Sequence, residues 1–438
     1  EKENIMNKSL EMRLRASNVI PGGNSLLSKR SEMFSPSKWP GYFNSSKGII
    51  VEDLDNKLYK DFSHFAVGTC TLGYSNSEVN NAVKKSIDLG TMSTLNCPEE
   101  VYLAETLTKM HTWASKVKFA RTGGEANAIA IRLARAATGK DKILINGYHG
   151  WHDWYLSVNL SEGMDLDTHL LPGLKPLGVP KALLNTVETF QVGDLDKIRD
   201  EFKSGSYAAL KMEVMRSERP TQKYLEDIRS LCNEYGVLLI FDECTSGFRE
   251  AFGGMHLNYG IFPDLCVLGK TIANGFPMTC VLGTQKVMND SSTSFISSTF
   301  FTDRVGFVAA LKTLEIMEQK KSWKIITELG EYYTKKVNQV FEKSNLNISW
   351  SGMPSLIGYS IKSKDWPYLK TFITERFLDF GYLHGCLFYP SISHTKLDID
   401  DFVKILSNIV IEIDNKGIDL IVSEIGSNVC HSTFKRLN

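Results

Sequence analysis

The sequence predicts an α/β protein with one large central domain and a smaller domain built from both ends of the chain. From about residue 60, short β-rich runs alternate with helix-like segments over most of the 438 residues. Continuous apolar strands separated by amphipathic helices are typical of a mostly parallel sheet covered on both faces. A chain of this length has room for two or three compact units. We expect residues 1–60 and 306–438 to form the small domain and 61–305 the large one.

The elements follow in order along the chain. Apolar positions at helical spacing predict a helix over 5–20, ended by Pro21-Gly22-Gly23. Residues 47–62 alternate apolar and polar side chains around Asp55-Asn56, as in a hairpin. A long helical stretch begins near 305, and residues 348–361 form a strand pair in the mixed α/β tail. The β-rich runs of the large domain are 117–121, 142–146, 208–214, 237–243, 264–269 and 280–284.

Composition excludes several classes of protein. The chain carries 50 Lys+Arg against 50 Asp+Glu, so it lacks the concentrated positive charge that nucleic acids and anionic membranes require. Apolar runs such as 237–241 are too short to cross a bilayer. The first 20 residues lack the apolar core of a secretory signal. Eight scattered cysteines without a C-x-x-C pair indicate a reducing compartment, and we expect a cytoplasmic enzyme.

Two residues at strand ends are the first candidates for chemistry. Asp242 ends the run 237–243, and Lys270 follows the run 264–269. Because parallel strands place their carboxyl ends along one edge, both side chains are expected to face one crevice. Singly, Asp242 is better explained as a helix cap and Lys270 as a solvated loop lysine. Together with Gly123-Gly124 at the start of a helix, the pair favours a functional site.

A phosphate site is predicted after the strand 117–121. Thr122, Gly123 and Gly124 form a short turn into an amphipathic helix, whose free N–H groups and positive dipole end favour an anion. A plain tight turn into a helix is the alternative. The stretch Gly269-Lys270-Thr271 resembles the end of a P-loop, but Asp264 stands where that motif needs glycine and a strand fills the interval, which argues against nucleotide hydrolysis.

An aromatic–histidine motif follows the strand 142–146. Tyr148 can lie flat against a planar heterocycle. His149 and His152 have a spacing compatible with metal ligation, but no further His, Asp or Glu cluster has recognisable ligand spacing. We therefore predict no metal site.

A phosphate turn, a stacking aromatic, a carboxylate and a strand-end lysine together fit pyridoxal 5′-phosphate. Its aldehyde needs a lysine amine to hold it as a Schiff base. Its pyridine nitrogen needs an acidic partner so that the ring can withdraw electrons. Its phosphate supplies binding energy away from the reacting carbon. The sequence therefore predicts a pyridoxal-phosphate enzyme.

From 20–24 to about 415, the sequence resembles a class III aminotransferase of the fold-type-I pyridoxal-phosphate family, closest to the glutamate-1-semialdehyde aminomutase branch. The most specific stretches are LLIFDECTSGFR (238–249) and PDLCVLGKTIANGFP (263–277). The resemblance implies a large domain with a mostly parallel seven-stranded sheet and a small α/β domain.

The resemblance also implies roles for individual residues. Lys270 matches the Schiff-base lysine and Asp242 the partner of the pyridinium nitrogen. Thr299 matches the threonine that reaches the phosphate from the partner subunit, which implies a homodimer with shared sites. The remaining cofactor-binding residues implied are the phosphate turn Thr122, Gly123 and Gly124, the ring-stacking Tyr148 with His149 of a Tyr-His-Gly motif, and Glu213 at the end of the preceding strand.

The chain departs from the family pattern at several positions. Gly124 replaces a threonine, and Glu218 stands where relatives carry the asparagine near the ring hydroxyl. In the register of the arginine that grips the substrate carboxylate stands Ser28, with Lys29 and Arg30 just beyond. The stretch 387–395 is shorter than the aminomutase pattern. The cofactor residues are therefore kept, while substrate recognition has changed.

We expect a homodimeric aminotransferase that moves an amino group between an amino donor and an aldehyde or ketone, with Lys270 transferring the α-proton. Glutamate-1-semialdehyde 2,1-aminomutase chemistry is the alternative, and the departures favour transamination. A segment over 162–180 could close over a retained intermediate, or be a plain surface loop. Racemisation, decarboxylation and a binding protein without catalysis also stay open, although Lys270 and Asp242 count against the last.

Overall fold

The protein, described by a computed structural model for residues 7–163, 165–169, 172–216 and 218–433, divides into two compact units. Unit 1 holds the described residues up to Asn76 and those from Ile325 onward, and unit 2 is Ser77–Lys324. A small domain built from both chain ends is therefore present. The divisions lie at 76/77 and 324/325 rather than at the expected 60/61 and 305/306.

Packing explains both displaced boundaries. Phe62 and Phe65 belong to the hydrophobic core of unit 1, and Gly48 forms a β-bridge with Tyr74, which binds this stretch to unit 1. Helix α11 (Arg304–Lys320) packs on α3 (Ser77–Asp88) and α4 (Pro98–Met110) of unit 2. The long helical stretch expected after 305 is two helices, because Lys321 adopts a left-handed conformation (φ 51°) between α11 and α12 (Ser322–Phe341).

Unit 2 is built around one seven-stranded sheet with the order β4-β10-β9-β8-β7-β5-β6. Only β10 runs antiparallel to its neighbours, so the predicted mostly parallel sheet is confirmed. The short edge strand β6 was not predicted. The strands are β4 (Lys116–Ala120), β5 (Lys142–Asn146), β6 (Val187–Thr189), β7 (Tyr207–Glu213), β8 (Leu238–Glu243), β9 (Leu265–Leu268) and β10 (Thr279–Gly283).

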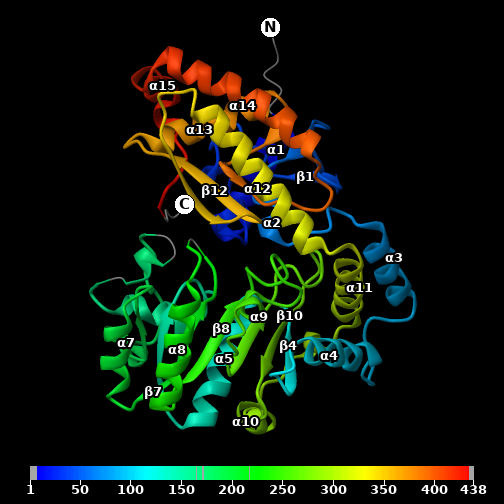
Figure 1. Cartoon of the computed structure of the whole chain (residues 1–438). Coiled ribbons are helices and arrows are strands. Elements are labelled where there is room, and N and C mark those ends of the chain that lie inside the picture. Colours follow the sequence, from blue (N-terminus) through cyan, green and yellow to red (C-terminus); the bar gives the residue numbers. More distant parts are fainter. Residues whose placement is uncertain (1–6, 164, 170–171, 217, 434–438) are drawn as a thin grey trace. The chain divides into compact units, whose positions relative to one another are not determined.

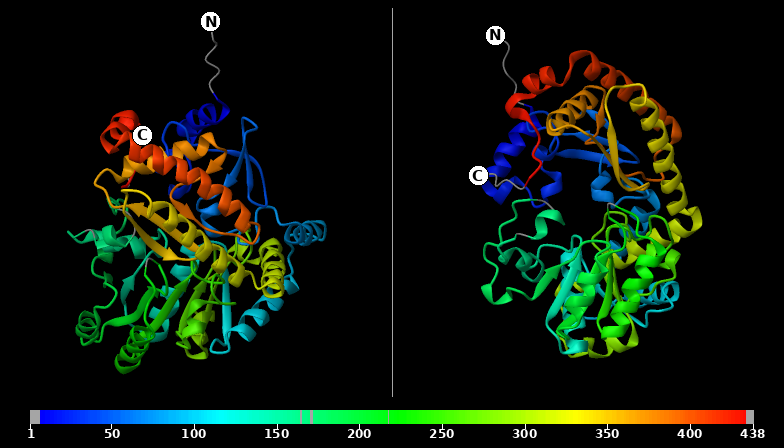
Figure 2. Two further views of the ribbon diagram at one scale, coloured as in Figure 1. Left: turned by 45° about the horizontal axis from the view of Figure 1, so that its top comes forward. Right: turned by 60° about the vertical axis from the view of Figure 1, so that its left-hand side comes forward.

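Helices cover both faces of this sheet (Figures 1 and 2). Ile129 and Leu133 of α5 pack in one buried cluster with Ile240 and Val267 of the sheet. Successive strand residues point to opposite faces, so Leu239 faces the other side, where α8 lies against β8. Besides α3, α4 and α11, the described α-helices of this unit are α5 (Gly123–Thr138), α6 (Asp153–Leu156), α7 (Leu195–Phe202), α8 (Gln222–Tyr235), α9 (Met255–Tyr259) and α10 (Gln285–Met288).

Unit 1 joins the two chain ends through strand pairing. The expected hairpin is β2 (Ile50–Asp53) with β3 (Leu58–Asp61), and β3 pairs in parallel with β13 (Tyr382–Leu383) from the other end of the chain. The expected strand pair is β11 (Ile348–Met353) with β12 (Leu356–Ile361). The other elements are α1 (Lys8–Val19), β1 (Phe43–Lys47), α2 (Phe65–Gly68), α13 (Trp366–Asp379), β14 (Leu387–Phe388), α14 (Lys396–Lys416) and α15 (Ile418–Ile425).

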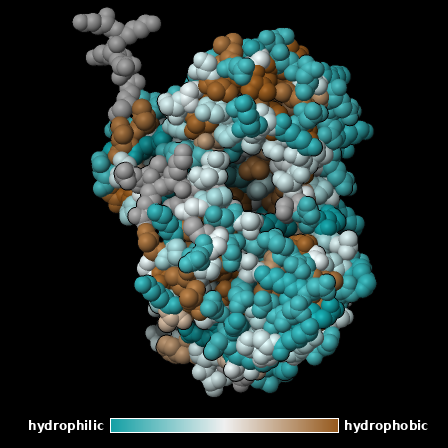
Figure 3. All heavy atoms as spheres, turned by 90° about the vertical axis from the view of Figure 1, so that its left-hand side faces the viewer, coloured by the Kyte–Doolittle hydropathy of each residue, from teal (hydrophilic) through white to brown (hydrophobic). Residues whose placement is uncertain are grey.

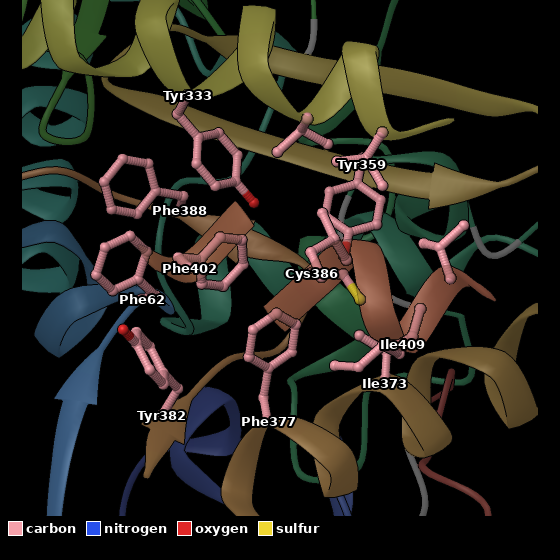
Figure 4. Packing of buried hydrophobic residues seen from close by; sticks show 14 of the residues in the cluster. Phe62, Tyr333, Tyr359, Ile373, Phe377, Tyr382, Cys386, Phe388, Phe402 and Ile409 are labelled. Atoms are coloured by element: carbon pink, nitrogen blue, oxygen red, sulfur yellow. The ribbon is translucent and has the colours of Figure 1, made fainter. Parts of the chain in front are cut away.

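Aromatic side chains fill the core of unit 1 (Figure 4). The ring of Phe62, which is 0% exposed, stacks on Phe388 and on Phe402, each with ring centroids 4.9 Å apart. Phe402 in turn stacks on Phe377 with centroids 4.4 Å apart. Residues from β14, α13 and α14 thus meet around Phe62, which directly follows β3, so the core depends on both ends of the chain.

None of the eight cysteines forms a disulfide bond. Among the described residues, no helix is long and apolar enough to cross a bilayer. On the face drawn in Figure 3, hydrophilic residues (teal) prevail and hydrophobic ones (brown) form separate groups.

We predict that Phe62→Ala lowers the free energy of unfolding by about 3–5 kcal/mol, because it removes stacking contacts and leaves a cavity. Urea denaturation followed by circular dichroism measures the change. The matched control is Phe43→Ala, whose ring is 62% exposed, and it should alter stability by no more than about 0.5 kcal/mol. Equal losses in the two variants would contradict this account of the core.

Candidate active site

The carboxyl edge of the unit 2 sheet brings the predicted residues together. Asp242 and Glu213 are paired neighbours at the ends of β8 and β7. Strand β9, which Lys270 follows after Gly269, pairs with β8 on its other side. Tyr148 follows β5, the next strand beyond β7. Four strand ends in register therefore contribute to one edge, which is where ligands bind in open α/β sheets.

Asp242 is a buried carboxylate, 2% exposed, that depends on close partners. Its Oδ1 accepts the Cys244 N–H at 3.0 Å, and its Oδ2 lies 2.8 Å from His149 Nδ1. Burial by itself would raise the pKa of Asp242, but the charge of Lys211 and the His149 hydrogen bond outweigh it and hold that pKa below its usual range. Asp242 is therefore ionised and suited to hold a cationic nitrogen.

Lys270 lies half-buried at the end of β9. Its Nζ donates to Thr245 Oγ1 at 2.7 Å, so a hydroxyl from the loop after β8 holds the amine. A Cβ on Gly269 would overlap Cys244 Sγ, so the loops after β8 and β9 pack directly on each other here. The backbone N–H of Cys244 bonds Asp242, and its side chain packs beside Gly269, which directly precedes Lys270.

The phosphate turn has the predicted strand–turn–helix form. Thr122 caps α5: its Oγ1 accepts the Glu125 N–H at 3.4 Å, and Glu125 Oε2 accepts the Thr122 N–H at 2.9 Å. The N–H groups of Gly123 and Gly124 head the helix, where the first turn has no intrahelical acceptors. A Cβ on Gly123 would contact Cys244 Sγ at 3.2 Å, so this turn lies beside the Asp242 loop.

Tyr148 and His149 occupy different places beside Asp242. Tyr148 is half-buried and meets Tyr155 edge-on, with ring centroids 6.0 Å apart. Its backbone N–H donates to Glu213 Oε2 at 2.9 Å. His149 is 0% exposed and faces Asp242 with one ring nitrogen and the Asn146 carbonyl with the other, at 3.0 Å. Burial lowers the pKa of His149, against the effect of Asp242.

Thr299 begins a short 3-10 helix, η8 (Thr299–Thr302), and is exposed. Arg121, directly before the phosphate turn, holds this segment. Its guanidinium donates to the carbonyls of Phe300 at 2.7 Å, Phe301 at 2.9 Å and Asp303 at 2.7 Å. The Thr299 segment is thus fixed to the residue that precedes Thr122.

The residues at which the chain departs from the family pattern lie in other surroundings. In unit 1, Lys29 and Arg30 line a cavity of about 540 Å³, and the Ser28 carbonyl lies 3.2 Å from His64 Nε2. In unit 2, Glu218 lines a polar pocket of about 320 Å³ with Arg216, whose Nη1 donates to Glu213 at 2.7 Å. Of the segment 162–180, residues 164, 170 and 171 lie outside the described residues, as does residue 217.

One buried group in the described part of the chain offers metal-ligating atoms: Glu243, His256 and Cys266, within 4.8 Å of one another. Its polar atoms already have protein partners. Glu243 accepts the Met255 N–H at 2.6 Å and pairs with His256 Nδ1, while His256 Nε2 accepts the Trp113 N–H at 3.0 Å. These bonds hold Glu243, the last residue of β8, in place. Our expectation of no metal stays a prediction.

Sequence reasoning missed three residues of this site. Thr245 holds Lys270, Arg121 holds the Thr299 segment, and Lys211 of β7 places its Nζ 3.8 Å from Asp242 Oδ2. A signal existed only for Lys211, a charged residue inside an apolar strand. Thr245 and Arg121 could not be found, because their partners are distant in sequence or lie on another loop.

Comparisons with known proteins show the family. The model of the class-III aminotransferases matches residues 37–410, and the chain belongs to that family. It is 31% identical over 410 residues to the 3-aminobutyryl-CoA aminotransferase of Cloacimonas acidaminovorans, covering 90% of this chain and 94% of the relative. It is 32% identical over 360 residues to the glutamate-1-semialdehyde 2,1-aminomutase of Methanothrix thermoacetophila, covering 80% and 81%.

Solved structures agree on the fold. The FumI protein of Sphingopyxis sp. MTA144 superposes with a TM-score of 0.84 at 25% identity, covering 93% of this chain and 97% of that one. A glutamate-1-semialdehyde aminomutase from Pseudomonas aeruginosa PAO1 gives a TM-score of 0.78 at 18% identity, covering 92% and 94%. The predicted fold-type-I architecture is confirmed.

The chain is thus an enzyme of a pyridoxal-phosphate-dependent family, and its residues fit that cofactor. The glycine turn heading α5 leaves room where a Cβ on Gly123 would stand against Cys244. Ionised Asp242 can receive a ring N–H, since a carboxylate offers about four lone-pair sites. Lys270 presents a half-buried amine. Phosphate, ring nitrogen and aldehyde thus each have a chemically suitable partner in unit 2.

We predict that Gly147→Ala destabilises the protein more than Gly193→Ala does. Both glycines have positive φ, 107° and 92°, so alanine strains either backbone by about 1–2 kcal/mol. Only at Gly147 would the new Cβ also strike Glu213 Oε2, at 2.5 Å, whereas Gly193 has open space. Urea denaturation should show an extra loss of about 1 kcal/mol or more for Gly147→Ala, with weaker cofactor binding. Equal effects would contradict the close packing of Gly147 on Glu213.

Proposed function

We propose that this enzyme transfers an amino group between a small amino donor and an aldehyde or ketone acceptor, with Lys270 as the residue that holds the cofactor. The observation that carries the proposal is the amine of Lys270, half-buried at the carboxyl edge of the sheet and bonded to Thr245 at 2.7 Å. Cys244, between the Asp242 carboxylate and Gly269, supports a single site for both residues.

Each residue has a role that its position supports. When bound, pyridoxal phosphate supplies an aldehyde that reacts with amines and a ring that withdraws electrons. Asp242 Oδ holds the proton of the ring nitrogen, and Tyr148 covers a face of the ring. The N–H groups of Gly123 and Gly124, with the Thr122 hydroxyl, bind the phosphate. Lys270 would bind the aldehyde, and its Nζ would take a proton from the substrate and return it.

The relatives support two kinds of amino transfer. One is named an aminotransferase and another a glutamate-1-semialdehyde 2,1-aminomutase, which would run both half-reactions on one molecule. We favour transfer between two molecules, because Ser28 stands in the register of the carboxylate-gripping arginine. A panel of amino donors, each scored for converting the bound aldehyde form to the amine form with release of a carbonyl product, discriminates the two reactions.

We also propose a homodimer whose sites are shared between subunits. Thr299 is exposed, and Phe300 beside it is 67% exposed and Phe295 83% exposed. Large exposed apolar side chains beside a segment that Arg121 fixes support a partner surface there. In this arrangement Thr299 donates its hydroxyl to the phosphate bound by the partner subunit.

We predict that borohydride reduction of the cofactor-loaded enzyme attaches the cofactor to Lys270, and that Lys270→Ala lowers turnover at least about a thousandfold, because the nucleophile and the proton carrier are lost together. Peptide mass spectrometry locates the label, and the control Lys286→Ala, at an exposed lysine, should retain activity. A label on another lysine would refute the assignment.

A mixed dimer tests the shared site. In a dimer of one Lys270→Ala and one Thr299→Ala subunit, one site would combine an intact Lys270 with an intact Thr299 from the other subunit. We predict that this dimer, purified with two different affinity tags, has about half the wild-type activity and one site of wild-type cofactor affinity. If Thr299 acts within its own subunit, no intact site forms and the mixed dimer stays impaired.

A further inference from the structure

Lys211 is a lysine buried beside Asp242. It lies within β7, its side chain is 0% exposed, and its Nζ has no hydrogen-bond partner in the described part of the chain. The nearest opposite charge is Asp242, with Oδ2 at 3.8 Å. An isolated ammonium is expensive to bury, so its presence depends on that carboxylate. None of the roles proposed above uses Lys211.

The surroundings of Lys211 leave Asp242 as its main partner. The groups that act on it come from three adjacent strands: Asp242 and Cys244 from β8 and its following loop, Cys266 from β9, and Glu213 from β7 itself. Burial lowers the pKa of Lys211, whereas Asp242 raises it. His149, on Oδ2 of Asp242, also experiences the Lys211 charge. A single carboxylate thus faces a lysine and a histidine before any ligand arrives.

Having both Lys211 and His149 beside it affects how strongly Asp242 can stabilise a protonated ring nitrogen of the cofactor. A ring nitrogen keeps its proton because the nearby negative charge stabilises the pyridinium cation. A second cation beside the same carboxylate repels that pyridinium and weakens its stabilisation, since Coulomb interactions are strong where water is excluded. Lys211 therefore keeps Asp242 ionised and at the same time reduces its hold on the ring proton.

We propose that Lys211 is a positioning residue that acts through Asp242, competing with the pyridine nitrogen for the carboxylate and so setting how much of the bound cofactor carries a proton on its ring. The inference rests on the proposed role of Asp242. It means that the electron sink of this enzyme is moderated by a residue that does not touch the cofactor.

The charge is tested with Lys211→Met, which keeps the length of the side chain and removes the cation. Two ligands are compared on the full-length protein: pyridoxal phosphate and its 1-deaza analogue, whose ring has a C–H in place of the nitrogen. We expect the ratio of their affinities to shift on the order of tenfold in favour of pyridoxal phosphate, equivalent to about one pKa unit on the ring nitrogen. The analogue carries no ring proton, so effects of volume alone act on both ligands.

Two control variants accompany the test. Lys211→Arg keeps the charge and should retain the wild-type ratio. Leu210→Met, at the adjacent buried position whose side chain faces the other side of β7, should also leave the ratio unchanged. An equal change for both ligands in Lys211→Met, no change, or a shift toward the analogue would overturn the proposal.

A measurement on the wild-type enzyme needs no variant. In the holoenzyme reconstituted with ¹⁵N-labelled pyridoxal phosphate, the chemical shift of the ring nitrogen should move with pH, because protonation is incomplete; in Lys211→Met it should stay at the protonated value. A wild-type nitrogen protonated at every pH would overturn the proposal even if the variant fails to fold. The variant Asp242→Asn distinguishes the two proposals. If Asp242→Asn leaves the ring protonation unchanged, the proposed function of Asp242 is refuted. If Asp242→Asn changes it and Lys211→Met does not, only the proposal for Lys211 is refuted.

Discussion

The site depends on keeping one buried carboxylate ionised at the end of β8. Asp242 is almost removed from water, and a charge in that position persists only where donors and cations surround it. The Cys244 N–H, His149 and Lys211 provide that environment from the loop after β8, the loop after β5 and strand β7. The strand order β8-β7-β5 is therefore part of the chemistry, since it brings these three sources to Asp242.

Close packing between loops holds the residues of the site in fixed positions. Cys244 fills the space beside Gly123 and Gly269, so the phosphate turn, the Asp242 loop and the Lys270 strand lie in contact around one small side chain. Arg121 extends the arrangement to the Thr299 segment through three backbone carbonyls. Groups held on strand ends and fixed helix termini lose little freedom when a ligand binds, which favours precise placement of a cofactor.

The residues that fit the cofactor and those in the register of the family's carboxylate-gripping arginine lie in different parts of the chain. The residues that fit pyridoxal phosphate all belong to unit 2, whereas Ser28, Lys29 and Arg30 belong to unit 1. Lys29 and Arg30 line their own cavity there, and the aromatic core around Phe62 ties their unit to the far end of the chain.

The sequence by itself determined six of the seven strands of the sheet, the small domain from both chain ends and the strand-end positions of Asp242, Lys270, Thr122 and Tyr148, because hydrophobic periodicity and strand-end residues are local signals. Family resemblance added Thr299 and Glu213. Only the tertiary structure decided that His149 contacts Asp242, that Thr245 bonds Lys270 and that Lys211 lies 3.8 Å from the Asp242 carboxylate. It also decided that the helical stretch after 305 is interrupted at Lys321 and that residues 61–76 belong to unit 1. These depend on which strands become neighbours and which loops touch, and contacts between residues far apart in the chain leave no local pattern.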